Sequence, residues 1–173
     1  MIYFISDTHF HHSNIIKYCN RPFKNINEMN ETIISNWNNL ITKDDIVYHL
    51  GDFCLSNDDE IKNIFNRLNG NIILIRGNHD RKPVKFYENI GIKVLTHAPI
   101  ILDEYKLMLS HVPLPDVKIK DGYINLHGHI HNKKISDDYP KNYSINKHIN
   151  VSVDVTNFKP VSLNIINKLK NNK

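Results

Sequence analysis

The tetrapeptide Gly77-Asn78-His79-Asp80 combines side chains that could do chemistry together. It directly follows the apolar run 72–75, which is typical of a strand buried on both faces, so it lies where α/β proteins place their ligands. Asn78 offers a carbonyl oxygen, His79 offers a ring that can move a proton, and Asp80 could orient that ring. A simple turn after a strand would look the same, so the interpretation depends on the rest of the chain.

Polar side chains follow four other apolar runs in the same way. Asp7 and His9 follow 2–5, Asp52 follows 46–50, His111 follows 106–109, and His129 and His131 follow 124–126. Nitrogen and oxygen donors without thiolate suit a divalent first-row ion such as manganese, iron, nickel, cobalt or zinc. The ligands are too many for one ion and fit two ions roughly 3.5 to 4 Å apart, the arrangement that hydrolyses phosphate esters.

Strands and helices that could position these groups alternate in the first half of the chain. Strands are expected at 2–5, 46–50 and 72–75, because each is a short apolar run next to turn residues. Helical spacing predicts four helices: a short one capped by Ser13, one over 27–41, one from a capping box at 56–59 to Gly70, and one over 84–90. This β-α-β-α-β order favours a parallel sheet.

The second half of the chain is richer in strand-like segments. They are expected at 93–96, 100–102, 106–109, 124–126 and 149–153. The polar stretch 132–147 predicts a long loop. After Pro160, apolar spacing predicts a helix that packs on the sheet, although 161–163 could instead form a last strand.

The composition limits the class of protein. A chain of 173 residues with 40% hydrophobic and 23% charged residues predicts one soluble domain spanning 1–173. No run could cross a membrane, no signal peptide is visible, and two cysteines favour a reducing cytoplasm. The charge of +4 could suit an anionic substrate, but it is too scattered to favour nucleic acid as a partner.

As a set, the motifs resemble those of a known family. Asp7-x-His9, Gly51-Asp52, Gly77-Asn78-His79-Asp80, His111 and Gly128-His129-x-His131 are similar, in order, to all five motifs of the calcineurin-like metallophosphoesterases. Within that family the chain resembles the small, single-domain bacterial and phage-type phosphoesterases. The resemblance implies an α/β fold, a four-layer α/β/β/α sandwich of two mixed sheets flanked by helices, with a dimetal site at one end of the sheets.

The resemblance also implies a role for each motif residue. One ion would be held by Asp7, His9 and His131, the other by Asn78, His111 and His129, with Asp52 bridging. His79 matches the histidine near the leaving group, and Asp80 its orienting partner. Two ions would activate a shared hydroxide and bind the phosphoryl oxygens, and a protonated His79 would protonate the departing alkoxide.

Residues outside the motifs could contribute to the site. Arg21 is a candidate phosphate clamp, because a guanidinium matches a phosphate bidentately, although a solvated arginine before proline is an equal alternative. His12 could reach the substrate or a carboxylate behind the metal ligands, and Arg76 could anchor a strand end. Asp154 is interpreted as a carboxylate that supports either the fold or a metal ligand. Structural roles are expected for His49, Cys54, His97 and His148.

These observations together predict a metal-dependent phosphoesterase with two divalent ions, manganese being favoured. Phosphodiesters are favoured over monoesters, since a proton donor such as His79 matters most for a poorly activated leaving group. The alternatives are a nuclease acting on DNA or RNA, a phosphomonoesterase, and a scaffold that has lost catalysis. The presence of His79 argues against the scaffold. The natural substrate, which could be a nucleotide, and the oligomeric state stay open.

Overall fold

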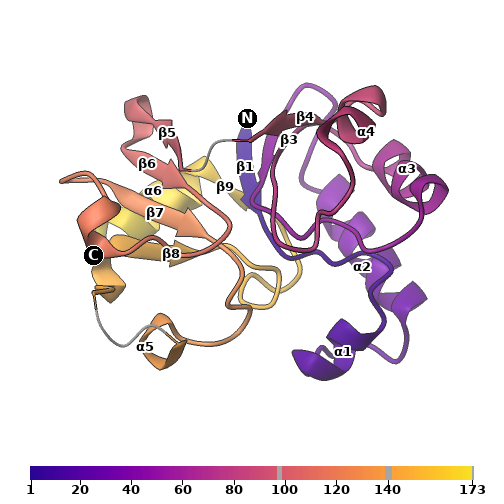
Figure 1. The fold of residues 1–173 in the computed structure, drawn as a ribbon, viewed down its shortest axis with the longest axis horizontal. Helices are drawn as coiled ribbons and strands as arrows, with labels where there is room; N and C mark the ends of the chain where they lie inside the picture. Colours follow the sequence, from indigo (N-terminus) through magenta and orange to yellow (C-terminus); the bar gives the residue numbers. More distant parts are fainter. Residues whose placement is uncertain (97–98, 139–141, 173) are drawn as a thin grey trace.

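The structure is a computed structural model that describes residues 1–96, 99–138 and 142–172, and it contains two mixed sheets flanked by helices (Figure 1). The first sheet consists of β1 Ile2–Ile5, β2 Ile46–His49, β3 Asn71–Ile75, β4 Lys93–Leu95 and β9 Val161–Ser162. The second consists of β5 Ile100–Leu102, β6 Leu107–Leu109, β7 Ile124–His127 and β8 His148–Asn150. The helices are α1 Asn14–Tyr18, α2 Ile26–Asn38, α3 Asp58–Arg67, α4 Val84–Asn89, α5 Ile135–Asp138 and α6 Leu163–Asn171.

The first sheet has the strand order β4-β3-β2-β1-β9. Strands β1 to β4 are parallel, as the β-α-β-α-β pattern predicted, and β9 pairs antiparallel with β1. His49 is level with both Ile5 and Leu74, so the three strands end at nearly the same height. The loops that follow β1, β2 and β3 therefore leave from one edge of the sheet.

The second sheet has the order β5-β6-β7-β8. Strand β5 is antiparallel to β6, whereas β6, β7 and β8 are parallel. Leu109 pairs with Leu126, and Leu126 pairs with Ile149, so the carboxyl ends of these strands are also level. The predicted α/β class with two mixed sheets is confirmed.

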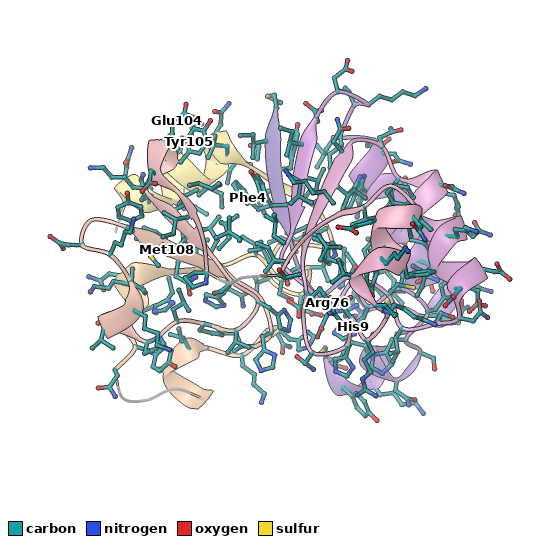
Figure 2. The ribbon with its side chains drawn as sticks, turned by 45° about the horizontal axis from the view of Figure 1, so that its top comes forward. Phe4, His9, Arg76, Glu104, Tyr105 and Met108 are labelled. Atoms are coloured by element: carbon teal, nitrogen blue, oxygen red, sulfur yellow. The ribbon has the colours of Figure 1, made fainter. Side chains whose placement is uncertain are left out.

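Two hydrophobic cores fix the position of the layers, because successive residues of a strand point to opposite faces. On one face of the first sheet, Leu74 packs with Trp37 of α2 and with apolar residues of α3 and α4. On the other face, Phe4 packs with Leu109 and Leu126 of the second sheet, and Figure 2 shows Phe4 between the two sheets. Burying each large apolar side chain contributes about 1.5–3 kcal/mol. The core between the two sheets therefore keeps the carboxyl ends of their strands next to each other.

The outer face of the second sheet is covered by a thin layer. Lys120 donates its backbone N–H to Sδ of Met108 at 3.3 Å, and Leu114 donates its own to Oδ1 of Asn125 at 2.9 Å. The segment 112–120, with the 3-10 helix η2 Asp116–Lys118, thus lies over this face. Helix α6 contributes Ile166 to the core between the sheets instead.

Several local predictions differ from the structure. Ser13 has helical φ/ψ and makes no capping hydrogen bond, so α1 begins without the predicted cap. Helix α3 is capped by Asn57, whose side chain accepts the backbone N–H of Glu60 at 3.0 Å, and not by Ser56. Ser56 instead donates to the Glu60 carboxylate. The hydroxyl is therefore engaged by a side chain and not by the helix end.

Other differences concern the element boundaries. Helix α2 ends at Asn38 and not at 41, and both alternatives after Pro160 are realised in turn, since β9 leads directly into α6. The stretch expected to be a loop over 132–147 contains α5 and the 3-10 helix η3 Ile145–Lys147. His97 lies outside the described residues. Within those residues, the helices are all too short or too polar to cross a membrane.

Candidate metal centre

The loops that leave β1, β2 and β3 run side by side. The backbone N–H of Asp7 donates to the carbonyl of Gly51 at 3.0 Å, and that of His9 donates to the carbonyl of Asp52 at 3.0 Å. The next loop joins them, since the backbone N–H of His79 donates to Oδ1 of Asp52 at 2.9 Å. Figure 2 labels His9, which belongs to the loop after β1. The first three motifs therefore converge, as their positions after parallel strands predicted.

The backbone at the centre is strained. Left-handed φ angles occur at Asp7 (58°), His9 (49°), Asp52 (57°), His129 (69°) and His131 (52°). Each such angle costs a non-glycine residue of the order of 1–3 kcal/mol, and such residues cluster at functional sites. All of them were predicted as metal ligands from the sequence.

Two motif glycines allow the loops to approach closely. A Cβ at Gly77 would lie 2.2 Å from Oδ1 of Asp52, and one at Gly128 would lie 2.0 Å from Oγ of Ser6 and 2.3 Å from Oδ2 of Asp7. No real Cβ tolerates such distances. The glycines therefore bring the carboxylates of Asp7 and Asp52 against the neighbouring loops.

Asp52 lies between two imidazoles from different sheets. Its Oδ2 is 3.4 Å from Nε2 of His9 and 3.4 Å from Nε2 of His111. Asp7 extends this arrangement, because its carboxylate lies within 4.8 Å of ligand atoms of both His9 and His131, and also of both Asp52 and His111. Two adjacent groups of donors thus share the acidic residues.

The second group is completed by the loops after β3, β6 and β7. Oδ1 of Asn78 lies 3.0 Å from Nε2 of His111 and 3.1 Å from Nδ1 of His129. The two histidine nitrogens are 3.2 Å apart. Nδ1 of His111 donates to the carbonyl of Leu50 at 2.8 Å, which leaves Nε2 to bind an ion.

The donors fit a metal because their nitrogen and oxygen lone pairs converge on one another. Nε2 of His9 is buried and, among the described residues, has no hydrogen-bond partner. Burial acts to lower the pKa of His111, but the carboxylates of Asp52 and Asp7 raise it to about 9. Burial acts to raise the pKa of Asp52, but His111 and His9 hold it well below its usual range. A site of this kind favours positive charge, supplied by a proton or by a divalent ion.

Comparison with known proteins agrees with this geometry. The model of the calcineurin-like phosphoesterase family matches residues 1–168 of the chain. The chain belongs to this family. The predicted family resemblance is therefore confirmed.

Relatives of this phosphoesterase include an uncharacterised protein, MJ1445, of Methanocaldococcus jannaschii, which is 48% identical over 171 residues, covering 97% of this chain and 90% of the relative. Among solved structures, the protein of unknown function AQ665 from Aquifex aeolicus superposes with a TM-score of 0.75 at 30% identity, over 98% of both chains. The nuclease MPE of Pseudomonas putida is more distant, with a TM-score of 0.49 and 20% identity over 75% of this chain and 61% of its own. This last likeness carries no argument about activity.

Arg21 of the phosphoesterase does not bind substrate, and that prediction is wrong. Its side chain is fully buried and forms a bidentate ion pair with Asp154, at 2.8 and 2.9 Å. The same guanidinium donates to the carbonyls of Asp7 and Thr8, at 2.8 and 3.1 Å. A guanidinium with these partners cannot turn towards a phosphate. It instead fixes the backbone of the first motif.

Asp154 contacts His131 directly, in agreement with its interpretation as a carboxylate that supports the fold or a metal ligand. Nδ1 of His131 donates to Oδ2 of Asp154 at 2.8 Å. Burial acts to lower the pKa of His131, but this hydrogen bond raises it to about 10. Burial also acts to raise the pKa of Asp154, but His131 and Arg21 lower it to about 2. The ion pair thus orients the ring that the family motif assigns to the first ion.

The predicted role of Asp80 as the orienting partner of His79 is wrong. The Asp80 carboxylate accepts three backbone N–H groups, from Asp52 at 2.7 Å, Phe53 at 2.9 Å and Gly77 at 2.8 Å. Nδ1 of His79 has no hydrogen-bond partner within the described part of the chain. Asp80 therefore holds the second and third motif loops together.

The contacts of Arg76 agree with its prediction, and those of His12 show where its ring lies. Nε and one terminal nitrogen of Arg76 donate to the carbonyl of Asp80, at 3.0 and 2.6 Å, so Arg76 anchors the end of β3. His12 lies over the centre, with its Nδ1 3.1 Å from Nδ1 of His9 and its ring 5.8 Å from that of His79. Burial, and then His9 and His79, lower the pKa of His12 to about 4.

His49 has a positioning role that the sequence concealed. Its Nδ1 accepts the backbone N–H of Gly51 at 3.3 Å, so its Nε2 carries the proton and donates to Oγ1 of Thr8 at 3.0 Å. Thr8 in turn donates to the carbonyl of Phe53 at 2.7 Å. The buried ring links the first two motif loops. Its position inside a strand made it look like an ordinary core residue.

Proposed function

We propose that the protein is a phosphodiesterase that works with two divalent ions. The first would be held by Asp7, His9 and His131, the second by Asn78, His111 and His129, with Asp52 between them. The observation that carries the proposal is the position of Asp52, whose Oδ2 is 3.4 Å from Nε2 of His9 and 3.4 Å from Nε2 of His111. A carboxylate between two imidazoles is suited to bridging two ions.

When bound, such a pair of ions activates water and neutralises charge on the phosphoryl group. The chain supplies the other functions. His79 is anchored by its backbone to Oδ1 of Asp52 at 2.9 Å, and its ring is 5.2 Å from that of His9. These contacts support a role for His79 as the donor of a proton to the leaving oxygen. The proposed role of His12 is to contact the substrate, which its proximity to the rings of His9 and His79 supports.

The preference for diesters rests on this proton donor. Alkoxide leaving groups of natural diesters are strongly basic, so a donor such as His79 contributes most to their departure. Manganese is the proposed metal. Iron, nickel, cobalt and zinc are alternatives, because oxygen and nitrogen donors bind all of these ions and their availability in the cell decides between them. The two cysteines, both free and buried, agree with a cytoplasmic setting.

The test uses protein stripped with a chelator and reloaded with each metal in turn. Bis-p-nitrophenyl phosphate reports diester hydrolysis, p-nitrophenyl phosphate reports monoester hydrolysis, and elemental analysis counts the bound ions. We expect about two ions per chain and metal-dependent cleavage, faster for the diester. Absence of metal-stimulated cleavage of both substrates would refute the proposed activity. Faster cleavage of the monoester would make the protein a phosphomonoesterase.

A further inference from the structure

His79 lies in the wall of two cavities. One has a volume of about 380 Å³ and includes His12, Tyr18 and Lys133 in its wall. The other has a volume of about 210 Å³ and includes Arg81 and Lys82. A phosphate beside His79 therefore has a separate space for each of its two substituents.

The first cavity has an exposed aromatic wall. Tyr18, the last residue of α1, is 73% exposed, whereas Ile15 on the same helix is only 3% exposed and forms apolar lining. The Tyr18 ring lies edge-on to that of His12, with centroids 6.2 Å apart. An aromatic side chain left in water beside a catalytic centre is a stacking surface for a planar ring, such as a nucleobase.

In the wall of the second cavity, the Arg81 guanidinium has no acidic partner among the residues that the structure describes. Lys82 is engaged, since it pairs with Asp58 and lies 5.9 Å from the centroid of the Phe86 ring. The side chain of Arg81, by contrast, is exposed and makes no ion pair or hydrogen bond with any described residue. A free guanidinium binds phosphate through two parallel hydrogen bonds. This cavity is therefore suited to an anionic group.

The two sides of the centre thus differ in chemistry. We propose that the substrate is an asymmetric phosphodiester, with a planar aromatic group against Tyr18 and a second phosphate group against Arg81. A short dinucleotide with a terminal phosphate has both features. The inference rests on the proposed phosphodiesterase activity and adds a substrate class to it.

The main test compares three dithymidine substrates on the manganese-loaded protein. TpT has no terminal phosphate, pTpT has one at the 5′ end, and TpTp has one at the 3′ end. We expect at least one phosphorylated dinucleotide to have a KM about tenfold below that of TpT, as a charge-assisted hydrogen bond of ordinary strength would give. Arg81→Ala should abolish this difference by raising the KM of the phosphorylated dinucleotide to that of TpT, because the terminal phosphate loses its guanidinium partner.

Matched variants separate recognition from general effects of charge and shape. Arg67→Ala removes an exposed arginine that pairs with Glu31 on the helical side of the molecule, and it should keep the preference. Tyr18→Ala should raise KM for all the dinucleotides about fivefold or more, whereas Tyr18→Phe should keep the wild-type KM because the ring remains. Calorimetric binding of pTpT, TpTp and TpT to the metal-loaded His79→Gln variant should give the same order.

The outcomes distinguish this inference from the proposed function. If bis-p-nitrophenyl phosphate is not cleaved, the phosphodiesterase proposal itself fails. If it is cleaved but the dinucleotides are not, or if TpT and the phosphorylated dinucleotides have equal KM, the substrate class is wrong and the phosphodiesterase proposal stands. A preference that persists in Arg81→Ala would likewise overturn the role of Arg81.

Discussion

Asp154 accepts a hydrogen bond from Nδ1 of His131 at 2.8 Å and so leaves Nε2 as the ring nitrogen that can bind an ion. The same carboxylate is paired with Arg21, which donates to the backbone carbonyls of Asp7 and Thr8. One buried ion pair therefore connects a histidine from the fifth motif with the backbone of the first. This ion pair therefore fixes His131 relative to the loop that carries Asp7, the two parts of the first proposed ion site.

Asp154→Asn should weaken both metal binding and folding. We expect metal affinity to fall about 10–100-fold, as for other partners of ligating histidines, when measured by competition with a chelator. The free energy of unfolding in urea should fall by about 3–5 kcal/mol, because the Arg21 charge stays buried without its partner. Asp103→Asn is the control, since Asp103 forms an exposed, solvent-screened pair with Lys120 and its replacement should leave the free energy of unfolding nearly unchanged. Equal effects of the two substitutions would refute the argument.

Asp80→Asn should disturb the second and third motif loops. An amide cannot accept all three backbone N–H groups that the carboxylate accepts, so at least one remains buried and unsatisfied. We expect a loss of about 1–3 kcal/mol in the free energy of unfolding, together with lower metal occupancy because Asp52 shifts. Normal occupancy with a change only in the pH profile of turnover would indicate that Asp80 acts through His79 after all.

His79→Gln should affect turnover and not metal binding. The ring is beside the proposed ligands without being one of them, so elemental analysis should find the same metal content as in the wild type. The kcat for diesters should fall by about 10²–10⁴, the usual contribution of a general acid. Loss of metal from this variant would instead make His79 part of the coordination sphere.

Burial of His49 should make the metal-free protein less stable in acid. Burial lowers the pKa of His49 from 6.5 to about 3, so between these values the unfolded chain binds a proton that the folded chain does not. With respect to His49, the free energy of unfolding is therefore highest above about pH 6.5. It falls by up to roughly 1.4 kcal/mol per pH unit as the pH is lowered towards about 3.

The His49→Gln variant isolates this effect. In urea unfolding of the metal-free protein, its stability should depend less steeply on pH between about 6.5 and 4 than that of the wild type. Burial also lowers the pKa of His127, to about 4, and this histidine contributes equally to the pH dependence of stability in both proteins. Parallel pH profiles for the two proteins would show that His49 does not carry this linkage.

Gly128→Ala should prevent the fifth motif from closing on the first. The new Cβ would lie 2.0 Å from Oγ of Ser6 and 2.3 Å from Oδ2 of Asp7, so the loops must separate. We expect a stability loss at or above the usual overpacking cost of about 1–3 kcal/mol, with loss of metal binding. Gly122→Ala is the matched control, because a Cβ there meets nothing within 4 Å and only its φ of +73° is strained. Metal binding should survive in the control.

The sequence predicted where most strands lie along the chain and which polar side chains follow them. Short apolar runs followed by Asp7, Asp52 or Asn78 identify strand ends, and parallel strands place such ends at one edge of a sheet. Local patterns of this kind depend on neighbouring residues only. They were therefore readable without the fold, and the family resemblance that the motifs carry implied the two mixed sheets.

Tertiary structure decided which groups support the centre. Arg21 looked like a phosphate clamp and Asp80 like a partner of His79, yet both are engaged by backbone groups. The partner of Arg21 is Asp154, 133 residues away in the chain. Contacts at such separation depend on how the two sheets pack through their shared core. No local pattern encodes that packing, so residue types alone could name the candidate ligands but not the groups that hold them.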